Sequence, residues 1–264
     1  MFLIAARWLG VVLIVFSIGW PQIRLHWPQV RPHLGYITAM GALGYTTFNA
    51  LFYGAAHNTS AINLGILQSM TPVFVMLAAY GVFRTAVSGL QMVGVVVTLL
   101  GVALVATQGE WDRLATFSFN PGDLMVIGAC LIYAGYAVWL RKKPNVPALV
   151  WFAMLALAAF AAAIPAAIAE WQLGYHQWPT TRGWVLAALT IVFPSLFAQL
   201  CFMKGVELIG PGRSGVFVNL VPVLASIAAV LILGEVFYWY HGAALVLVLG
   251  GIWIAERWAP SESA

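Results

Sequence analysis

The sequence is dominated by long apolar runs that follow one another with only short connectors between them. A helix needs about 20 consecutive apolar residues to cross a bilayer, and nine such runs succeed one another along the chain. They lie at residues 3–20, 35–56, 60–83, 88–107, 121–142, 148–170, 183–208, 211–234 and 238–257. Because the runs are continuous instead of alternating with a period of two, they favour membrane-spanning helices over a β-barrel. We therefore predict an all-α integral membrane protein with nine transmembrane helices.

Composition and connector length exclude several classes of function. Charged residues make up 8% of the chain and hydrophobic residues 62%, which rules out a water-soluble globular protein. The longest polar intervals, 20–34, 108–120 and 171–182, are expected to be loops and are too short for a soluble catalytic domain. Apart from the run Arg141–Lys143, the basic residues are scattered singly, which indicates membrane topology and not a nucleic-acid surface.

The chain contains an internal repeat with an offset of 150 positions. Shifting the sequence against itself without a gap pairs identical residues: Phe52 with Phe202, Gly65 with Gly215, Pro72 with Pro222, Val73 with Val223, Ala78 with Ala228, Leu99 with Leu249 and Gly101 with Gly251. Two copies of one helical unit are therefore predicted, a first copy at 1–110 and a second copy at 121–258.

The order of the runs predicts that the two copies are inverted. The run 3–20 and its counterpart 148–170 are the first and sixth spans, so an odd number of crossings gives the copies opposite orientations in the membrane. The second copy also begins with the run 121–142, whose counterpart would lie before Met1. We therefore expect a unit of five helices and a full complement of ten, with the first copy here lacking its first helix.

The basic residues predict which side of the membrane faces the cytoplasm. If the spans alternate in direction, one side carries Arg24, Arg31, Arg84, Arg141, Lys142, Lys143, Lys204, Arg213 and Arg257, and the other carries Arg113 and Arg182. The side richer in Lys and Arg is cytoplasmic by the positive-inside rule, which places the C-terminus inside. We expect the protein in a plasma membrane, namely the inner membrane of a bacterium.

Several short motifs, taken in order, resemble those of a known family. They are Ala-Ala-Arg-Trp-Leu at 5–9, the Pro-Val pairs beginning at 72 and 222, and Leu233-Gly234-Glu235 followed by the glycines at 250 and 251. In this order and spacing the chain resembles the drug/metabolite transporter superfamily, specifically its EamA-type exporters, which are built from two inverted five-helix repeats. The resemblance covers nearly the whole chain and implies export of a small metabolite. The first copy departs from the pattern, with Val82-Phe83-Arg84 where the second has Leu-Gly-Glu.

Two prolines near the middle of their spans predict kinked helices. Pro72 and Pro222 are repeat partners, and each lacks the N–H group that would bind the carbonyl four residues earlier, at Gln68 and Val218. Interrupted helices at corresponding positions of an inverted repeat point to a substrate site. A proline kink can also serve packing alone.

Uncharged polar residues within the spans are candidates for substrate binding. Asn49 and Gln199 are repeat partners, while Gln68 and Asn219 lie near the two prolines. Amides both donate and accept hydrogen bonds, which suits reversible binding of a polar solute in one central cavity between the repeats. Each amide taken singly could equally bond a neighbouring helix, so only the set argues for a site.

Three further residues are candidates for the same cavity. Tyr133 and Tyr136 are three positions apart and share a helix face, with ordinary packing or lipid contact as the alternative for each ring. Arg7 falls early in an apolar run and could bind a substrate carboxylate, or lie at the interface. Lys204 and Glu207, near the cytoplasmic end of their span, are expected to extend toward the interface or to form a local ion pair.

Two pairs of glycines are expected at close helix contacts. Gly94 and Gly101 are seven positions apart, as are Gly128 and Gly135, so each pair lies on one helix face. Small residues let two backbones approach closely in a membrane, and we assign these glycines a structural role.

Together these features predict a multi-pass transporter that exports a small metabolite, such as an amino acid or another amphiphilic compound, by alternating access. A non-conducting membrane scaffold or partner protein is the alternative. No enzyme is expected, because the five histidines lie in connectors or at span ends without the spacing of a metal site. The expected partners are a small-molecule substrate and the lipid bilayer, with no metal, cofactor or nucleic acid.

Overall fold

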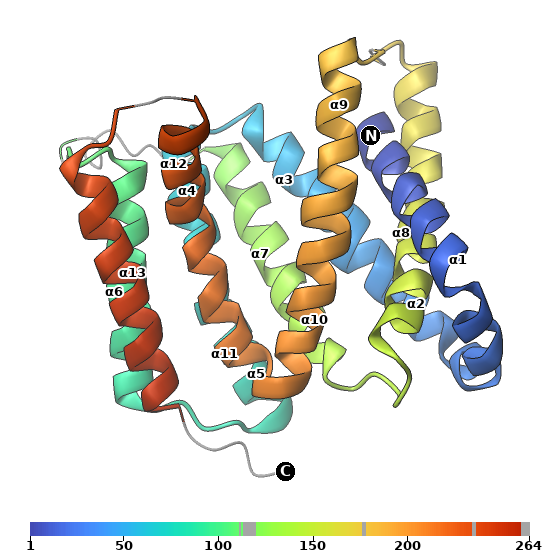
Figure 1. Ribbon diagram of the computed structural model, residues 1–264, viewed down its shortest axis with the longest axis horizontal. Helices are drawn as coiled ribbons and strands as arrows, with labels where there is room; N and C mark the ends of the chain where they lie inside the picture. Colours follow the sequence, from blue (N-terminus) through green and yellow to red (C-terminus); the bar gives the residue numbers. More distant parts are fainter. Residues whose placement is uncertain (111, 113–119, 176–177, 234–235, 260–264) are drawn as a thin grey trace. The chain divides into compact units, whose positions relative to one another are not determined.

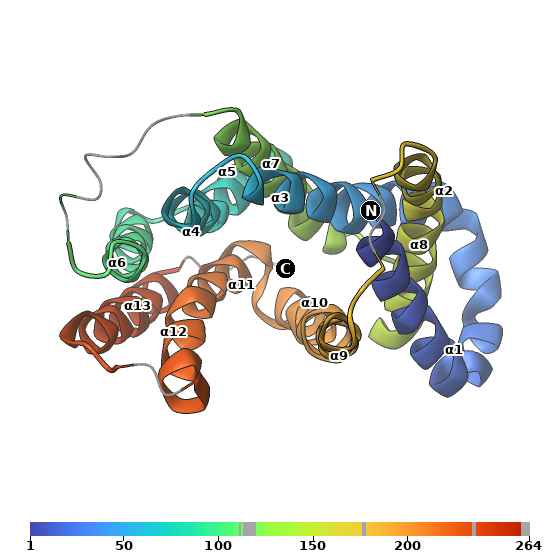
Figure 2. The same cartoon turned by 90° about the horizontal axis from the view of Figure 1, so that it is seen from above.

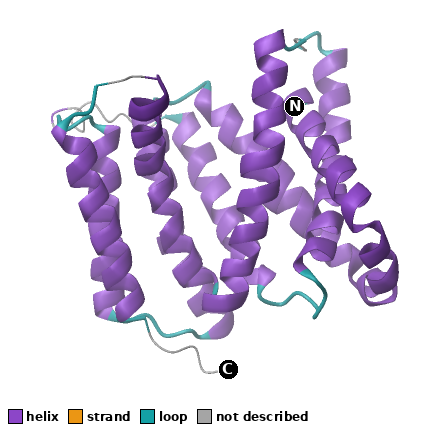
Figure 3. Cartoon of the chain, viewed as in Figure 1, coloured by secondary structure: helices purple, strands orange, loops and turns teal. Residues whose placement is uncertain are grey.

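A computed structural model describes residues 1–110, 112, 120–175, 178–233 and 236–259 of the chain (Figure 1). These residues form helices and loops and contain no strand (Figure 3). The first half contains α1 (Phe2–Val30), α2 (Leu34–Gly41), α3 (Phe48–Ala56), α4 (Ala61–Ser69), α5 (Thr71–Phe83) and α6 (Gly89–Ala106). The second half contains α7 (Pro121–Leu140), α8 (Ala148–Gln172), α9 (Thr181–Thr190), α10 (Ala198–Ile209), α11 (Pro211–Val216), α12 (Leu220–Leu233) and α13 (Trp239–Arg257). Arg113, Gly234 and Glu235, which enter the predictions above, lie outside the described residues.

Eight helical runs among the described residues are long and apolar enough to cross a membrane. The first of them, Phe2–Ala56, joins the spans predicted at 3–20 and 35–56 into one run of 55 residues, so the structure does not reproduce nine separate runs. The interval 20–34, predicted to be a loop, is helical: it lies in α1, in the 3-10 turn η1 (Arg31–His33) and at the start of α2. Its Gln, Arg and His residues are compatible with a helical backbone, and prolines are tolerated in spanning helices.

Local sequence signals explain where several helices begin and end. The hydroxyls of Ser60 and Ser88 accept hydrogen bonds from the N–H groups three residues later and thereby cap α4 and α6. Thr180 caps α9 in the same way. Arg84 adopts the left-handed conformation, with φ of 57°, and ends α5.

The chain divides into two compact units that cut across the two predicted copies. Unit 1 comprises residues 1–50 and 139–208, and unit 2 comprises residues 51–138 and 209–264. Each unit therefore contains helices from both copies of the repeat.

In unit 1, α1 packs along α8, which is its counterpart in the repeat (Figures 1 and 2). At one end the N–H of Phe2 donates to the Glu170 carboxylate at 2.5 Å, and at the other end Gly19 lies against the Leu149 side chain. Residues early in α1 thus meet residues late in α8. These two counterpart helices are antiparallel.

In unit 2, α6 packs along α13, again its counterpart. A Cβ atom on Gly94 would lie 2.6 Å from the Gly251 carbonyl oxygen, and one on Gly101 would lie 3.0 Å from the Ala244 carbonyl oxygen. By the offset of 150, Gly94 corresponds to Ala244 and Gly251 corresponds to Gly101. The two contacts are therefore repeat counterparts of each other, as a local two-fold axis between the helices would require. The helices are antiparallel, and the predicted close contacts at Gly94 and Gly101 are confirmed.

The same expectation fails for the other glycine pair, which lies on α7. A Cβ on Gly128 would make an ordinary contact of 3.7 Å with Leu51, and a Cβ on Gly135 would have no atom within 4 Å. A seven-residue spacing places two glycines on one helix face, but it does not determine whether a second backbone lies against that face.

Candidate functional site

Two π-helices occupy corresponding positions of the repeat in unit 1. The segment η2 spans Ala42–Thr47 and η4 spans Ile191–Phe197, so the shift of 150 superimposes their sequence ranges to within one residue. Pro194 within η4 lacks a backbone donor and so disturbs regular α-helical bonding there. Because π-helical turns occur frequently at functional sites, this pair marks part of unit 1 as a candidate site.

Arg7 of α1 is bonded to residues of both copies beside these π-helices. Its Nε donates to the Ser195 hydroxyl of η4 at 2.5 Å, and its Nη1 donates to the Asn49 amide oxygen, just beyond η2, at 3.3 Å. The Asn49 amide nitrogen donates to the Tyr45 carbonyl, and the Ser195 hydroxyl donates to the Thr190 carbonyl. Backbone carbonyls therefore orient both groups that bind the guanidinium.

Aromatic rings border this cluster. Trp8 and Tyr45 stack with their centroids 4.5 Å apart and an interplanar angle of 6°, and Phe152 meets Tyr45 edge-on at 6.3 Å. The Arg7 guanidinium carbon lies 5.5 Å from the Trp8 ring centroid, within the range of a cation–π interaction. All three rings are buried, so they keep the surroundings of the charge apolar.

The Arg7 cluster is suited to binding an anionic group. Arg7 is only 7% exposed within an apolar span, where burying a charge is costly, and the Ser195 and Asn49 oxygens that accept bonds from it are neutral. The guanidinium stays protonated and presents five N–H donors in a planar fork that matches a carboxylate or phosphate. Asn49 and Ser195 fix the orientation of that fork.

Gln199, the repeat partner of Asn49, lies in α10 of unit 1. Its amide oxygen is buried and has no hydrogen-bond partner among the described residues. A buried acceptor without a donor is destabilising. This oxygen can therefore accept a hydrogen bond from a bound donor, such as an ammonium group.

In unit 2, the helical path is interrupted ahead of both prolines. A turn separates α4 from α5 before Pro72, and the 3-10 segment η5 (Phe217–Asn219) separates α11 from α12 before Pro222. The Thr71 hydroxyl donates to the Gln68 carbonyl at 2.5 Å, which supplies a donor in place of the one that Pro72 lacks. The interruptions therefore occur at corresponding positions of the two copies.

The remaining candidate residues also lie in unit 2. Asn219 is 1% exposed, and its Nδ2 donates to the Thr98 hydroxyl at 2.8 Å while its amide oxygen has no partner among the described residues. The rings of Tyr133 and Tyr136 lie 5.8 Å apart, and Gln68 is partly buried. The structure thus brings Arg7 and Asn49 into contact within unit 1. The other four candidates lie in unit 2: Gln68, Tyr133, Tyr136 and Asn219.

A buried carboxylate in unit 2 has no counterpart among the sequence-based candidates. Asp123, in the first turn of α7, accepts hydrogen bonds from the Thr59 hydroxyl at 2.5 Å, the Asn63 amide at 3.1 Å and the Asn120 N–H at 2.9 Å. In the sequence, Asp123 looks like an ordinary acidic residue in the first turn of a helix. Only the polar residues Thr59 and Asn63 indicate in the sequence that a buried polar cluster could form there. No group of three His, Cys, Asp or Glu side chains that could hold a metal ion occurs in the described ranges.

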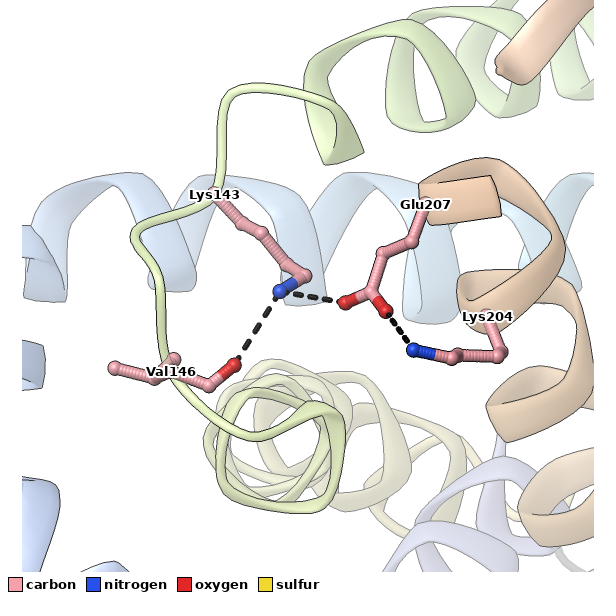
Figure 4. A network of polar contacts seen from close by, with 4 residues as sticks. All are labelled: Lys143, Val146, Lys204 and Glu207. Atoms are coloured by element: carbon pink, nitrogen blue, oxygen red, sulfur yellow. Dashed lines mark hydrogen bonds and ion pairs between the residues drawn. The ribbon is translucent and has the colours of Figure 1, made fainter. Parts of the chain in front are cut away.

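An ion-pair network in unit 1 joins the loop before α8 to the end of α10 (Figure 4). Glu207 accepts from Lys143 at 2.7 Å and from Lys204 at 3.0 Å, and Lys143 also donates to the Val146 carbonyl at 3.3 Å. The predicted pair of Lys204 and Glu207 is confirmed, with Lys143 as an additional member. The network holds the loop and the helix end together.

Comparison with known proteins establishes the family. A model of the EamA-like transporter family matches residues 1–107 and 120–256. The chain belongs to this family. This EamA protein is therefore a multi-pass membrane transporter and not an enzyme.

Two similar proteins are uncharacterized transporters of Bacillus subtilis (strain 168). YyaM is 24% identical over 242 residues, which cover 91% of this chain and 77% of that protein. YetK is 25% identical over 205 residues, which cover 77% of this chain and 62% of that protein. A solved crystal structure shares the fold, with a TM-score of 0.79 at 19% identity over 97% of this chain and 87% of that one.

Proposed function

We propose that this EamA protein exports a small amphiphilic metabolite that carries an anionic group, such as an amino acid, by alternating access. The observation that carries the proposal is the Arg7 cluster, in which one guanidinium is bonded to residues of both copies. A group bonded to both copies can have different contacts in two conformations. A ligand can shift a conformational equilibrium only if its affinity differs between the two states.

The proposed binding reaction uses the polar atoms described in unit 1. Arg7 binds the carboxylate of the substrate, and Asn49 and Ser195 hold the guanidinium in place. The buried Gln199 oxygen accepts a hydrogen bond from the ammonium group of the substrate. In unit 2, Gln68, Asn219, Tyr133 and Tyr136 are proposed as further substrate contacts, and the interruptions at Pro72 and Pro222 as flexible points of the transport cycle.

The proposed arrangement in the membrane has nine crossings and two inverted copies. The run Phe2–Ala56 is more than twice as long as the ~20 residues that one crossing needs, and Figure 1 shows the chain reversing direction between α1 and α2. The antiparallel packing of α1 on α8 and of α6 on α13 supports opposite orientations of the copies. The excess of Lys and Arg on one side supports a cytoplasmic C-terminus in a bacterial inner membrane.

The proposal is tested by flux measurements on the purified protein. Metabolites that accumulate outside cells producing the protein, compared with cells lacking it, identify the compound, whose flux is then measured in proteoliposomes. Arg7→Gln should reduce its flux at least tenfold, because a hydrogen bond to a charged group contributes about 1.5–3 kcal/mol. Asn49→Ala and Gln199→Ala should reduce it less, and Asn58→Ala, a change of an exposed amide beyond α3, should not.

Two outcomes would contradict the proposal. Equal flux in Arg7→Gln and Asn58→Ala would remove Arg7 from the binding site. Absence of flux for every compound that accumulates would favour the non-conducting scaffold.

A further inference from the structure

Unit 1 contains an apolar cavity that the transport proposal does not use. Its volume is about 580 Å³, and it is formed by α1, α2 and α8. Its walls include Phe16, Trp20 and Ile23 of α1, Ile37 of α2 and Leu157 of α8. A volume in the range of ~300–1,000 Å³ with mostly hydrophobic and aromatic walls is typical of a ligand pocket.

One cationic side chain lies in this apolar lining. Arg24 of α1 lines the cavity, is exposed, and has no hydrogen-bond or ion-pair partner among the described residues. No acidic residue occurs anywhere between Met1 and Gly109, and none lines the cavity. The charge of Arg24 is therefore available to an anionic ligand.

The acyl-chain part of the cavity fits within one leaflet of a bilayer. From Arg24 its α1 wall extends as far as Phe16, and eight residue steps of 1.5 Å give about 12 Å. The hydrocarbon of one leaflet is about 15 Å thick, half of a core of about 30 Å. Trp20 and Trp27 are exposed at the same end of α1 as Arg24, where amphipathic rings occupy the membrane–water interface.

We propose that this cavity binds one phospholipid with an anionic headgroup. Its phosphate binds Arg24, and an acyl chain lies along Trp20, Ile23 and Ile37. In the orientation proposed above, Arg24 lies in the cytoplasmic leaflet, where anionic lipids attract basic side chains next to spanning helices. This inference is independent of the transported compound, because none of these residues belongs to the Arg7 cluster.

The test measures lipid binding to the purified full-length protein by native mass spectrometry. The probes are phosphatidylglycerol and phosphatidylcholine with identical acyl chains. The wild type should bind phosphatidylglycerol about fivefold more tightly, since one basic residue near a membrane surface contributes about that factor. Arg24→Gln should abolish this preference. Arg31→Gln, which changes an exposed arginine outside the cavity, should retain it.

A second pair of variants tests the acyl-chain part of the site. Ala161→Trp fills the cavity and should weaken binding of both lipids severalfold, whereas Ala169→Trp, on an exposed part of α8 outside the cavity, should not. Equal affinity of the wild type for the two lipids would overturn the proposal, as would equal effects of Arg24→Gln and Arg31→Gln. Equal effects of the two tryptophan substitutions would likewise place the lipid elsewhere.

Discussion

The backbone contact between α6 and α13 makes a sharp prediction about two adjacent glycines. A Cβ added at Gly251 would lie 2.6 Å from the Gly94 carbonyl oxygen and 2.8 Å from the Thr98 nitrogen, so the two backbones would have to separate. A Cβ added at Gly250 would have no atom within 4 Å. We therefore expect Gly251→Ala to destabilise the protein and Gly250→Ala to leave it folded as before.

The magnitude follows from comparing these two variants directly. Alanine favours a helix over glycine by about 0.5–1 kcal/mol, and this contribution cancels because both positions lie in α13. The remaining difference in unfolding free energy between the two variants comes from overpacking at Gly251. Overpacking typically costs about 1–3 kcal/mol in a closely packed core. The free energy of unfolding of Gly251→Ala should be lower than that of Gly250→Ala by this amount.

The assay is unfolding of the purified protein in mixed micelles with increasing SDS, followed by tryptophan fluorescence. Gly101→Ala, at the repeat partner of Gly251, should also be destabilising, because its Cβ would lie 2.7 Å from Val248 and 3.0 Å from the Ala244 carbonyl. Equal unfolding free energies for Gly251→Ala and Gly250→Ala would refute the close backbone approach. A neutral Gly101→Ala would refute the two-fold relation between the contacts.

Two further predictions use the same unfolding assay. Asp123→Ala should lower stability by about 1–3 kcal/mol, because the Thr59 hydroxyl and the Asn63 amide lose a buried acceptor; a change below about 0.5 kcal/mol would show that water replaces the carboxylate. Lys143→Gln should lower stability by about 1 kcal/mol and Lys204→Gln by less than about 0.5 kcal/mol, because the two side chains are 10% and 61% exposed. Equal losses for the two lysines would contradict this ranking.

Hydropathy predicts the apolar helical runs except for the separation of 3–20 from 35–56, because apolar content is a local property of the chain. It does not predict backbone conformation between spans, which is why the interval 20–34 was expected to be a loop. Its polar residues and prolines lower the mean hydropathy without preventing helical hydrogen bonds at most positions. Low mean hydropathy is therefore no evidence against a helical backbone.

The candidate site was predictable only in part, because contacts depend on tertiary structure. The contact of Arg7 with Asn49 joins two residues separated by 42 positions, and the contact of Arg7 with Ser195 spans 188 positions. Asn49 could be chosen because buried amides need partners, but Ser195 gives no signal of its own in the sequence. The two π-helices could not be predicted either, because no simple residue pattern distinguishes a π-helical turn from an α-helix.

The paired π-helices have a consequence for how the residues after them are aimed. In an α-helix each residue advances the direction of the side chain by about 100°. A π-helical turn contains about one residue more than an α-helical turn. If Ala42–Thr47 kept all its residues but adopted α geometry, Asn49 would turn about a quarter of the way around the helix axis. Span length and hydropathy would hardly change, yet the amide would no longer face the guanidinium. The π-helical turn in each copy therefore determines the direction in which the side chains after it point. Amino-acid composition gives no indication of this effect.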